Sequence, residues 1–338
     1  MNNKDIKYSK YALVREMMET PDIIRNYNTG DASKFAKKVL TKKGLFLTGE
    51  GSSRIFPAKR AMYSLLKAGF FLPVITEGST QALEYNLNDY AVFAASNSGQ
   101  TKEVIRLATA LKKQKHDAVF GLTANKNTKL HEIVSDTHML SCGKENAVAA
   151  TKSVIEQGLF YDAVIHTVMG KKMAAFSDFA QKAETALTSS IDPKIIDIIK
   201  KASVIYFAGR NNGVAEELAL KTNEITRKKS GYLEGTFAVH GIEEVMDKSE
   251  VLIWISPFSE EEEKFFECLV KGVGMNVITM TSGKSRFPVI SVPDGGEYSE
   301  YIQLCAGWNL LVETGLSLGI DLDKPVRARK VGNEYIPE

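Results

Sequence analysis

The chain has 338 residues, more than a typical single core holds, and this length suits about two domains. Apolar residues make up 44% of the sequence and charged residues 25%, proportions that are ordinary for a globular protein in water. The formal net charge is only +2, so the chain lacks the strong field that a nucleic-acid or membrane-surface partner would require.

No apolar run approaches the roughly 18 residues of a transmembrane helix, and the polar start, MNNKDIKYSK, lacks the apolar core of a signal peptide. The cysteines are scattered and odd in number, which favours reduced thiols and a cytoplasmic protein. No histidine has metal-ligand spacing with another His, Cys or Asp, so no metal site is expected. The three cysteines are Cys142, Cys268 and Cys305.

Short apolar runs alternate with longer helical patterns from one end of the chain to the other. Apolar strands without polar alternation, each followed by a helix, indicate parallel sheets covered on both faces. Because the pattern occurs twice, we predict an α/β fold with two doubly wound, flavodoxin-like parallel-sheet domains in tandem. The expected strands are 44–49, 71–76, 90–96, 118–123 and 137–142 in the first half, and 203–209, 250–256, 276–281 and 287–293 in the second.

The same patterns predict five segments along the chain. They are an N-terminal helical segment (1–40), a first domain (41–170), a linking helix (171–195), a second domain (196–320) and a C-terminal tail (321–338). The tail contains the basic run KPVRARK. It is either a solvated terminus or a segment that folds over a site and brings a lysine to an anionic substrate.

Two loops in the first half combine glycine with small hydroxyl side chains: GEGSS (49–53) and SNSGQT (96–101). Helix capping and ordinary turn chemistry explain either loop alone. A strand that ends in such a loop at a helix N-terminus also makes an anion site. The second half has SPFSEEEEK (256–264) at the equivalent place, where glutamates would repel a phosphate. The candidate groups are therefore the Gly51 backbone and the hydroxyls of Ser52, Ser53, Ser96, Ser98 and Thr101.

The helical run 214–229 carries a lysine among apolar residues. Val214, Leu218, Lys221 and Ile225 recur at helical spacing, and Glu224 lies next to this stripe. A charge on a buried face is costly unless it is paired or functional, although an exposed Lys/Glu pair at this spacing is common. His240 follows in a glycine-punctuated segment, where it is either merely exposed or able to pass protons near neutral pH.

Several motifs of the chain occur in a known order. In REMMETPDIIRN (15–26), SNSGQT, ENAVAATKS (145–153), LALKTNEIT (218–226) and DLDKPVRARKV (321–331), the chain resembles the tandem SIS (sugar isomerase) family. This family includes the isomerase module of glucosamine-6-phosphate synthase and stand-alone phosphosugar isomerases, deaminases and deglycases. SNSGQT resembles its phosphate loop, Ser-x-Ser-Gly-Glu/Gln-Thr, and LALKTNEIT resembles its Lys-x-x-Glu helix.

The resemblance implies roles for individual residues. Glu224 and Lys221 would take part in proton transfer between C1 and C2 of the sugar, and Lys330 would be the active-site lysine of the tail. His240 would open the sugar ring, in its own subunit's site or in a neighbour's. The sugar phosphate would contact Gly51, Ser52, Ser53, Ser96, Asn97, Ser98 and Thr101, together with the backbone of Val148 and Ala150.

The implied function is that of a phosphosugar isomerase acting at C1/C2 of a hexose or amino-sugar 6-phosphate, with or without amine release. The alternatives are a deglycase of a 6-phosphorylated sugar–amino-acid conjugate and a non-catalytic sugar-phosphate sensor. We expect a small-molecule partner, no cofactor, no nucleic acid and no membrane. The family resemblance also implies a homodimer with active sites at its interface.

Overall fold

The structure is a computed structural model that describes residues 1–328 and 334–335. Contacts along the chain divide it into two units. The first unit contains Asp22–Phe176 and the described part of Arg327–Glu338, and the second contains Met1–Pro21 and Ser177–Val326. Each unit is described by itself below.

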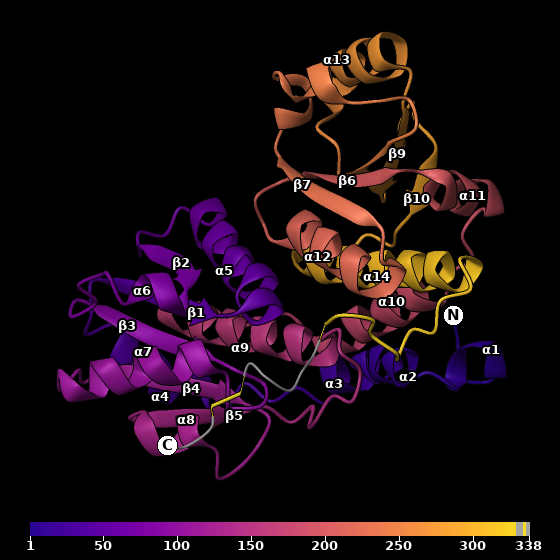
Figure 1. Cartoon of the computed structure of the whole chain (residues 1–338). Coiled ribbons are helices and arrows are strands. Elements are labelled where there is room, and N and C mark those ends of the chain that lie inside the picture. The colour runs from indigo at the N-terminus through magenta and orange to yellow at the C-terminus, as the bar shows by residue number, and fades with distance from the viewer. Residues whose placement is uncertain (329–333, 336–338) are drawn as a thin grey trace. The chain divides into compact units, whose positions relative to one another are not determined.

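The first unit is built on a five-stranded parallel sheet in the order β2-β1-β3-β4-β5 (Figure 1). The two strands β1 and β4 are buried at every position, as expected for a parallel sheet with both faces covered. The strands are β1 (Gly44–Gly49), β2 (Val74–Gly78), β3 (Tyr90–Ala95), β4 (Val119–Thr123) and β5 (Asp136–Met139).

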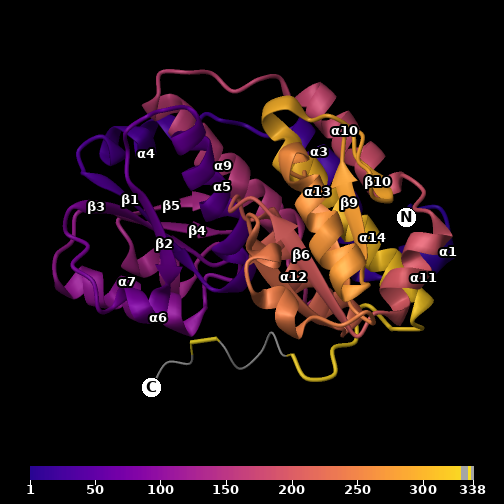
Figure 2. The same ribbon diagram turned by 90° about the horizontal axis from the view of Figure 1, so that it is seen from above.

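Helices cover both faces of this sheet (Figure 2). One face packs against α4, α5 and α9 through a core that includes Phe35, Phe93 and Phe160. The other face packs against α6, α7 and α8, with Leu107 and Leu130 in its core. The helices are α3 (Thr20–Arg25), α4 (Ala32–Val39), η1 (Gly51–Ser53), α5 (Ile55–Lys67), α6 (Ser79–Ala82), α7 (Lys102–Lys113), α8 (Lys129–Ile133) and α9 (Lys152–Val168).

The second unit repeats this design with a five-stranded parallel sheet in the order β10-β9-β8-β6-β7. When the strands of each unit are numbered from their own first strand, both sheets have the order 2-1-3-4-5, which is the flavodoxin-like order. The predicted fold class is therefore confirmed. The strands are β6 (Val204–Gly209), β7 (Lys229–Glu234), β8 (Val251–Ile255), β9 (Asn276–Thr281) and β10 (Val289–Ser291).

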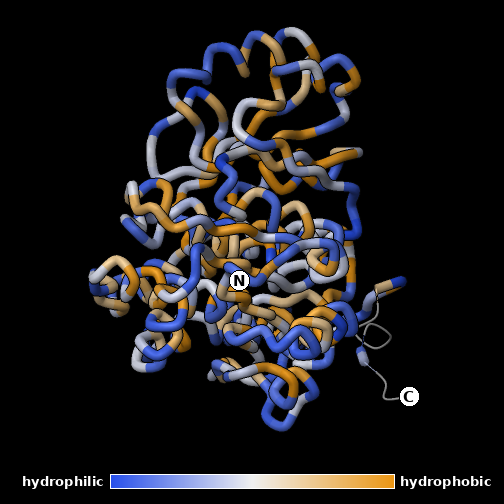
Figure 3. The backbone as a smooth tube through the Cα atoms, turned by 90° about the vertical axis from the view of Figure 1, so that its left-hand side faces the viewer, coloured by the Kyte–Doolittle hydropathy of each residue, from blue (hydrophilic) through white to orange (hydrophobic). Residues whose placement is uncertain are grey.

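The second sheet is also covered on both faces. Trp254 of β8 stacks on Phe265 on one side, and α12 packs on β6, β7 and α14. Figure 3 shows hydrophobic and hydrophilic stretches alternating along the backbone. The helices are α1 (Ile6–Ser9), α2 (Ala12–Met18), α10 (Phe176–Thr188), α11 (Pro193–Lys201), α12 (Val214–Thr226), η2 (Phe237–Val239), η3 (Ile242–Val245), η4 (Ser259–Glu261), α13 (Glu262–Phe265), the π-helical η5 (Phe266–Val273), η6 (Gly296–Tyr298) and α14 (Ser299–Ser317).

Strand β7 is absent from the sequence-based prediction. Its sequence, KSGYLE, mixes charged residues with Ser and Gly, and it lies at the edge of the sheet, where one side of the strand needs no apolar cover. Three other strands are shorter or shifted: β2 begins at Val74 after Pro73, β5 ends at Met139, and β10 spans only Val289–Ser291. Among the described residues, no helix combines the length and the apolar character needed to cross a membrane.

Candidate functional site

The two hydroxyl-rich loops of the first unit leave neighbouring strands at the same edge of the sheet. β1 and β3 pair in parallel, with Thr48 opposite Ala94, and each strand runs directly into its loop. In the order 2-1-3-4-5, β2 is added on one side of β1, whereas β3 and the later strands are added on the other side. Ligands of open α/β sheets bind at the switch point between two such strands, which here are β1 and β3. The fold thus brings 50–53 and 96–101 to the place where a ligand is expected.

Hydroxyl groups gather within the loop 96–101. Ser96 Oγ lies 2.7 Å from Thr101 Oγ1 and 3.4 Å from Ser98 Oγ, and Ser98 Oγ accepts the Gln100 N–H at 3.1 Å. Thr101 is the N-cap residue of α7, but its side chain makes no capping hydrogen bond. The hydroxyls therefore face one another in front of the start of a twelve-residue helix, an arrangement that suits an anion.

Gly99 gives this loop its shape. Its φ of +66° lies in the left-handed region, and a β-carbon there would lie 2.6 Å from Thr128 Cβ. The close approach is held by backbone hydrogen bonds from Gly99 to Ser96 and from Leu130 to Gly99. Only glycine fits both the conformation and the space.

The loop after β1 places Gly51 in the left-handed region, with φ at +54°, and its backbone then forms η1. Ser52 is buried and Ser53 half-buried. Glu50 precedes them, and its Oε1 accepts the Ser79 N–H at 2.9 Å. Desolvation raises the pKa of the Glu50 carboxyl, and the nearby Glu103 carboxylate raises it further.

A third loop of the first unit, 145–151, precedes α9. Val148 and Ala150 are half-buried in it, and Glu145 is 2% exposed. The Glu145 carboxylate accepts the Thr151 N–H at 2.7 Å and the Ser153 hydroxyl at 2.5 Å, and it accepts Asn97 Nδ2 at 3.0 Å. Glu145 thus connects the loop 96–101 with the start of α9.

In the second unit, α12 carries a buried ion cluster. Lys221 is fully buried on the apolar stripe with Val214, Leu218 and Ile225, as the helical spacing predicts. Its Nζ lies 2.6 Å from Glu224 Oε2 and 3.4 Å from Glu217 Oε1. The side chains of Lys221 and Glu217 are fully buried, and that of Glu224 is 23% exposed to solvent. The Lys221–Glu224 pair is therefore not an ordinary ion pair on the protein surface.

His240 follows η2 and is exposed. Its Nε2 lies 3.2 Å from Lys264 Nζ. In this unit the loop that begins at Ser256 corresponds to 96–101. Its polar groups already have partners within the chain, because Gln303 Nε2 donates to Ser256 Oγ at 2.7 Å and Arg210 donates to the Ser256 carbonyl.

The structure gathers the predicted residues into two groups, one in each unit. The first unit holds the phosphate-loop candidates, and the second holds Lys221, Glu224 and His240. Lys330 lies outside the described residues. Two residues of these groups, Glu145 and Glu217, are absent from the residues predicted from the sequence. Glu217 stands four residues before Lys221 on the same helix face, so its spacing was a usable signal, whereas nothing in the sequence marks the contact from Glu145 to Asn97.

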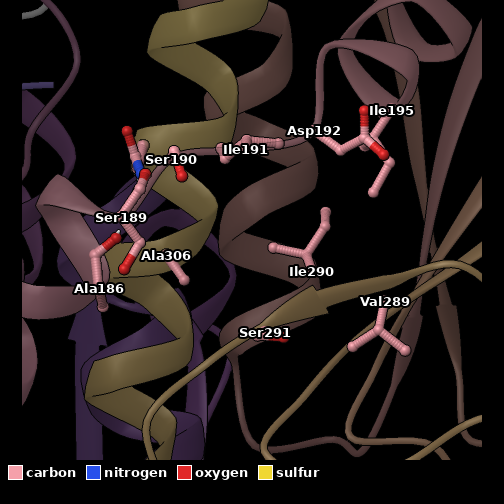
Figure 4. A pocket seen from close by; sticks show the side chains of 11 residues that line it. Ala186, Ser189, Ser190, Ile191, Asp192, Ile195, Val289, Ile290, Ser291 and Ala306 are labelled. Carbon is pink, nitrogen blue, oxygen red and sulfur yellow. Dashed lines mark hydrogen bonds between the residues drawn. The ribbon is translucent and has the colours of Figure 1, made fainter.

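A cavity of about 510 Å³ lies elsewhere in the second unit, between the α10–α11 connection and the edge strand β10 (Figure 4). None of the residues that line it is a predicted site residue. Asn309 in its wall bonds the Ser189 and Ala186 carbonyls, and Asp192 caps α11. Within the described part of the chain, no group of three or more His, Cys, Asp or Glu side chains is arranged to hold a metal ion.

Comparison with known proteins decides the family of the first unit. Residues 39–167 match the family model of the SIS domain. This segment is an SIS domain. The family resemblance found in the motifs is therefore confirmed, and the SIS domain contains all three loops described above. A comparison with curated protein sequences finds no match.

Solved structures of other proteins match nearly the whole length of the chain. The tagatose-6-phosphate ketose/aldose isomerase from Escherichia coli matches with a TM-score of 0.79 at 18% identity, over 97% of this chain and 99% of that one. Glucosamine-6-phosphate deaminase from Thermotoga maritima matches with a TM-score of 0.72 at 20% identity, over 95% and 99%. The C-terminal domain of glucosamine-fructose-6-phosphate aminotransferase from Francisella tularensis matches with a TM-score of 0.74 at 18% identity, over 94% and 98%. The chain thus has the tandem SIS fold.

Proposed function

We propose that this protein is a cytoplasmic phosphosugar isomerase that moves a proton between C1 and C2 of a hexose or amino-sugar 6-phosphate. The single observation that carries the proposal is the Lys221–Glu224 pair on α12. A carboxylate beside a buried ammonium, with part of its surface exposed, is suited to removing a proton from a carbon next to a carbonyl. The hydroxyl-rich loops of the SIS domain support a phosphate-bearing substrate.

In the proposed reaction, the phosphate is held by Gly51, Ser52 and Ser53 and by the loop 96–101, with the backbone of Val148 and Ala150 near the sugar. His240 opens the sugar ring by moving a proton between O5 and O1. Glu224 takes the proton from C1 or C2, and the electron pair forms an enediolate. Glu224 then returns the proton to the neighbouring carbon, and a proton moves between O1 and O2 so that the carbonyl is restored on the other carbon. Lys221 offsets the negative charge, and Lys330 is the proposed further cation.

Amine release by the same machinery is the second candidate within this class. The structural relatives include both an isomerase and a deaminase. Proton transfer to or from C2 of an amino sugar precedes loss of ammonia, and a deglycase would release an amino acid in the same way. Measuring ammonia and free amino acids across a panel of amino-sugar phosphates and glycated amino-acid phosphates separates these reactions from simple isomerisation.

The decisive experiment uses fructose 6-phosphate in D₂O. An isomerase incorporates deuterium at C1 or C2, which NMR detects. Glu224→Gln should slow the exchange by about 10²–10⁴-fold while the sugar phosphate still binds. Binding without exchange in the unmodified protein would instead identify a sensor. The absence of both binding and exchange, across the amino-sugar phosphates as well, would contradict the proposed function.

We also propose that the protein is a homodimer with shared sites. Mixing Glu224→Gln with His240→Gln after separate purification tests this. Recovery of activity in the mixture, beyond that of either variant alone, is the expected result if His240 serves a neighbouring copy. No recovery, or a monomer by light scattering at micromolar concentration, would contradict the shared site.

A further inference from the structure

We infer that Glu145 and Asn97 form a positioning pair that sets the geometry of the phosphate loop, and that Asn97 acts through its contact with Glu145 and not through direct contact with the ligand. The inference rests on the proposed function, because it concerns how the same SIS domain holds a sugar phosphate. The juxtaposition that carries it is a buried carboxylate, 2% exposed, whose Oε2 accepts Asn97 Nδ2 at 3.0 Å.

Glu145 first fixes its own loop. Oε1 accepts the Thr151 N–H at 2.7 Å and the Ser153 N–H at 3.4 Å, and Oε2 accepts the Ser153 hydroxyl at 2.5 Å. These contacts close residues 145–153 into a ring at the N-terminal end of α9, where the helix dipole stabilises a negative charge. Val148 and Ala150, whose backbone is proposed to face the sugar, lie within this ring.

Asn97 is held through its side-chain nitrogen and its main-chain carbonyl. The main-chain carbonyl oxygen of Asn97 accepts the Ala124 N–H at 3.1 Å, the Thr123 hydroxyl at 3.0 Å and the Asn125 side-chain N–H at 2.8 Å. Because an ionised carboxylate only accepts hydrogen bonds, the amide nitrogen of Asn97 must face Glu145. The Asn97 amide oxygen is buried, so it is not open to a ligand. The side chain therefore connects two loops, and its neighbours Ser96 and Ser98 provide the ligand-facing hydroxyls.

A second buried carboxylate on the same side of the fold provides a matched control. Glu156 is also 2% exposed, and it accepts the Ser141 N–H, the Ser141 hydroxyl and the Cys142 N–H, each at 2.7 Å. These partners lie on the chain after β5, and none of them belongs to the loop 96–101. Glu156→Gln thus perturbs a similar buried network without touching the phosphate loop.

The test measures the dissociation constants for inorganic phosphate and fructose 6-phosphate by calorimetry, with the melting temperature alongside. Asn97→Asp places a carboxylate against Glu145, and we expect both affinities to fall about tenfold or more. The double variant Asn97→Asp/Glu145→Gln reverses donor and acceptor, and we expect it to recover most of the affinity. Glu156→Gln should lower the melting temperature and leave both dissociation constants unchanged.

The outcomes separate the inference from the function it rests on. If the unmodified protein binds neither probe, the proposed function is wrong. If it binds and the double variant is no better than Asn97→Asp, the added charge repels the ligand directly and the positioning pair is wrong. Equal loss of affinity in Asn97→Asp and Glu156→Gln would also overturn the inference, because general destabilisation would then explain both.

Discussion

Gly307 on α14 packs directly against Leu218 on α12, so closely that a β-carbon at position 307 would overlap both methyl groups of Leu218 and lie 2.9 Å from its Cγ. Leu218 is fully buried, so its side chain has no free space into which it can move. Because Lys221 and Glu224 lie on the same helix as Leu218, this contact sets the depth at which α12 sits over its sheet.

We therefore expect Gly307→Ala to push α12 outward and lower the free energy of unfolding by about 1–3 kcal/mol, the range typical of an overpacked core. Chemical denaturation measures this change. Leu218→Ala provides space at the same contact, so the double variant should be less destabilised than the sum of the two single variants. Strict additivity would show that the two residues do not share a contact.

Glu224→Gln tests the proposed base. The substitution keeps the shape of the side chain and removes its ability to accept the substrate proton, so we expect turnover to fall by about 10²–10⁴-fold. Affinity for the sugar phosphate should change little, because the proposed phosphate loops lie in the other unit. Single-turnover kinetics together with calorimetry separate these two quantities. Retained turnover, or a loss of binding alone, would remove Glu224 from its proposed role.

Gly99, the left-handed glycine of the loop 96–101, has a matched counterpart in Gly143. Gly99 and Gly143 have nearly the same φ, +66° and +69°, but a β-carbon at 143 would meet open space whereas one at 99 would meet Thr128. Alanine at either position incurs the backbone strain, roughly 1–2 kcal/mol. Gly99→Ala adds a steric clash, so we expect a larger loss of stability and weaker binding of phosphate. Similar binding by the two variants would contradict a tightly shaped loop.

The buried His138 is expected to make the stability of the protein depend on pH. Its ring stacks on Phe160, with centroids 4.1 Å apart, and it is 7% exposed. Burial lowers its pKa from the ordinary value of 6.5. The carboxylates of Asp31 and Glu156 oppose this shift, whereas Lys34 acts in the same direction as burial.

The sign follows from linkage. The unfolded chain binds a proton at His138 more readily than the folded protein does, so the free energy of unfolding falls as the pH drops through about 6.5 and below. His138→Phe keeps a ring to stack on Phe160 and removes the titration. Urea unfolding near pH 7.5 and 5.5 should show a smaller pH effect in this variant. An unchanged pH dependence would mean that other groups cause it.

The sequence by itself determined the fold class. Unbroken apolar strands followed by amphipathic helices have few arrangements other than a parallel sheet with both faces covered, and the pattern occurs twice. It also marked the loop 96–101 as a candidate anion site, because small hydroxyl residues and a glycine after a buried strand are a local signal. The burial of Lys221 was predictable for the same reason, since helical spacing is a local property.

Only the tertiary structure decided which distant residues meet. Strand β7 exists because β6 offers it hydrogen bonds along a sheet edge, although its own residues are poor strand formers. Asn97 and Glu145 are 48 residues apart and meet where the loop that follows β3 contacts the loop that precedes α9. Contacts of this kind depend on which elements pack together, and although periodicity marks the face of an element that packs, it does not say which residue the face will meet.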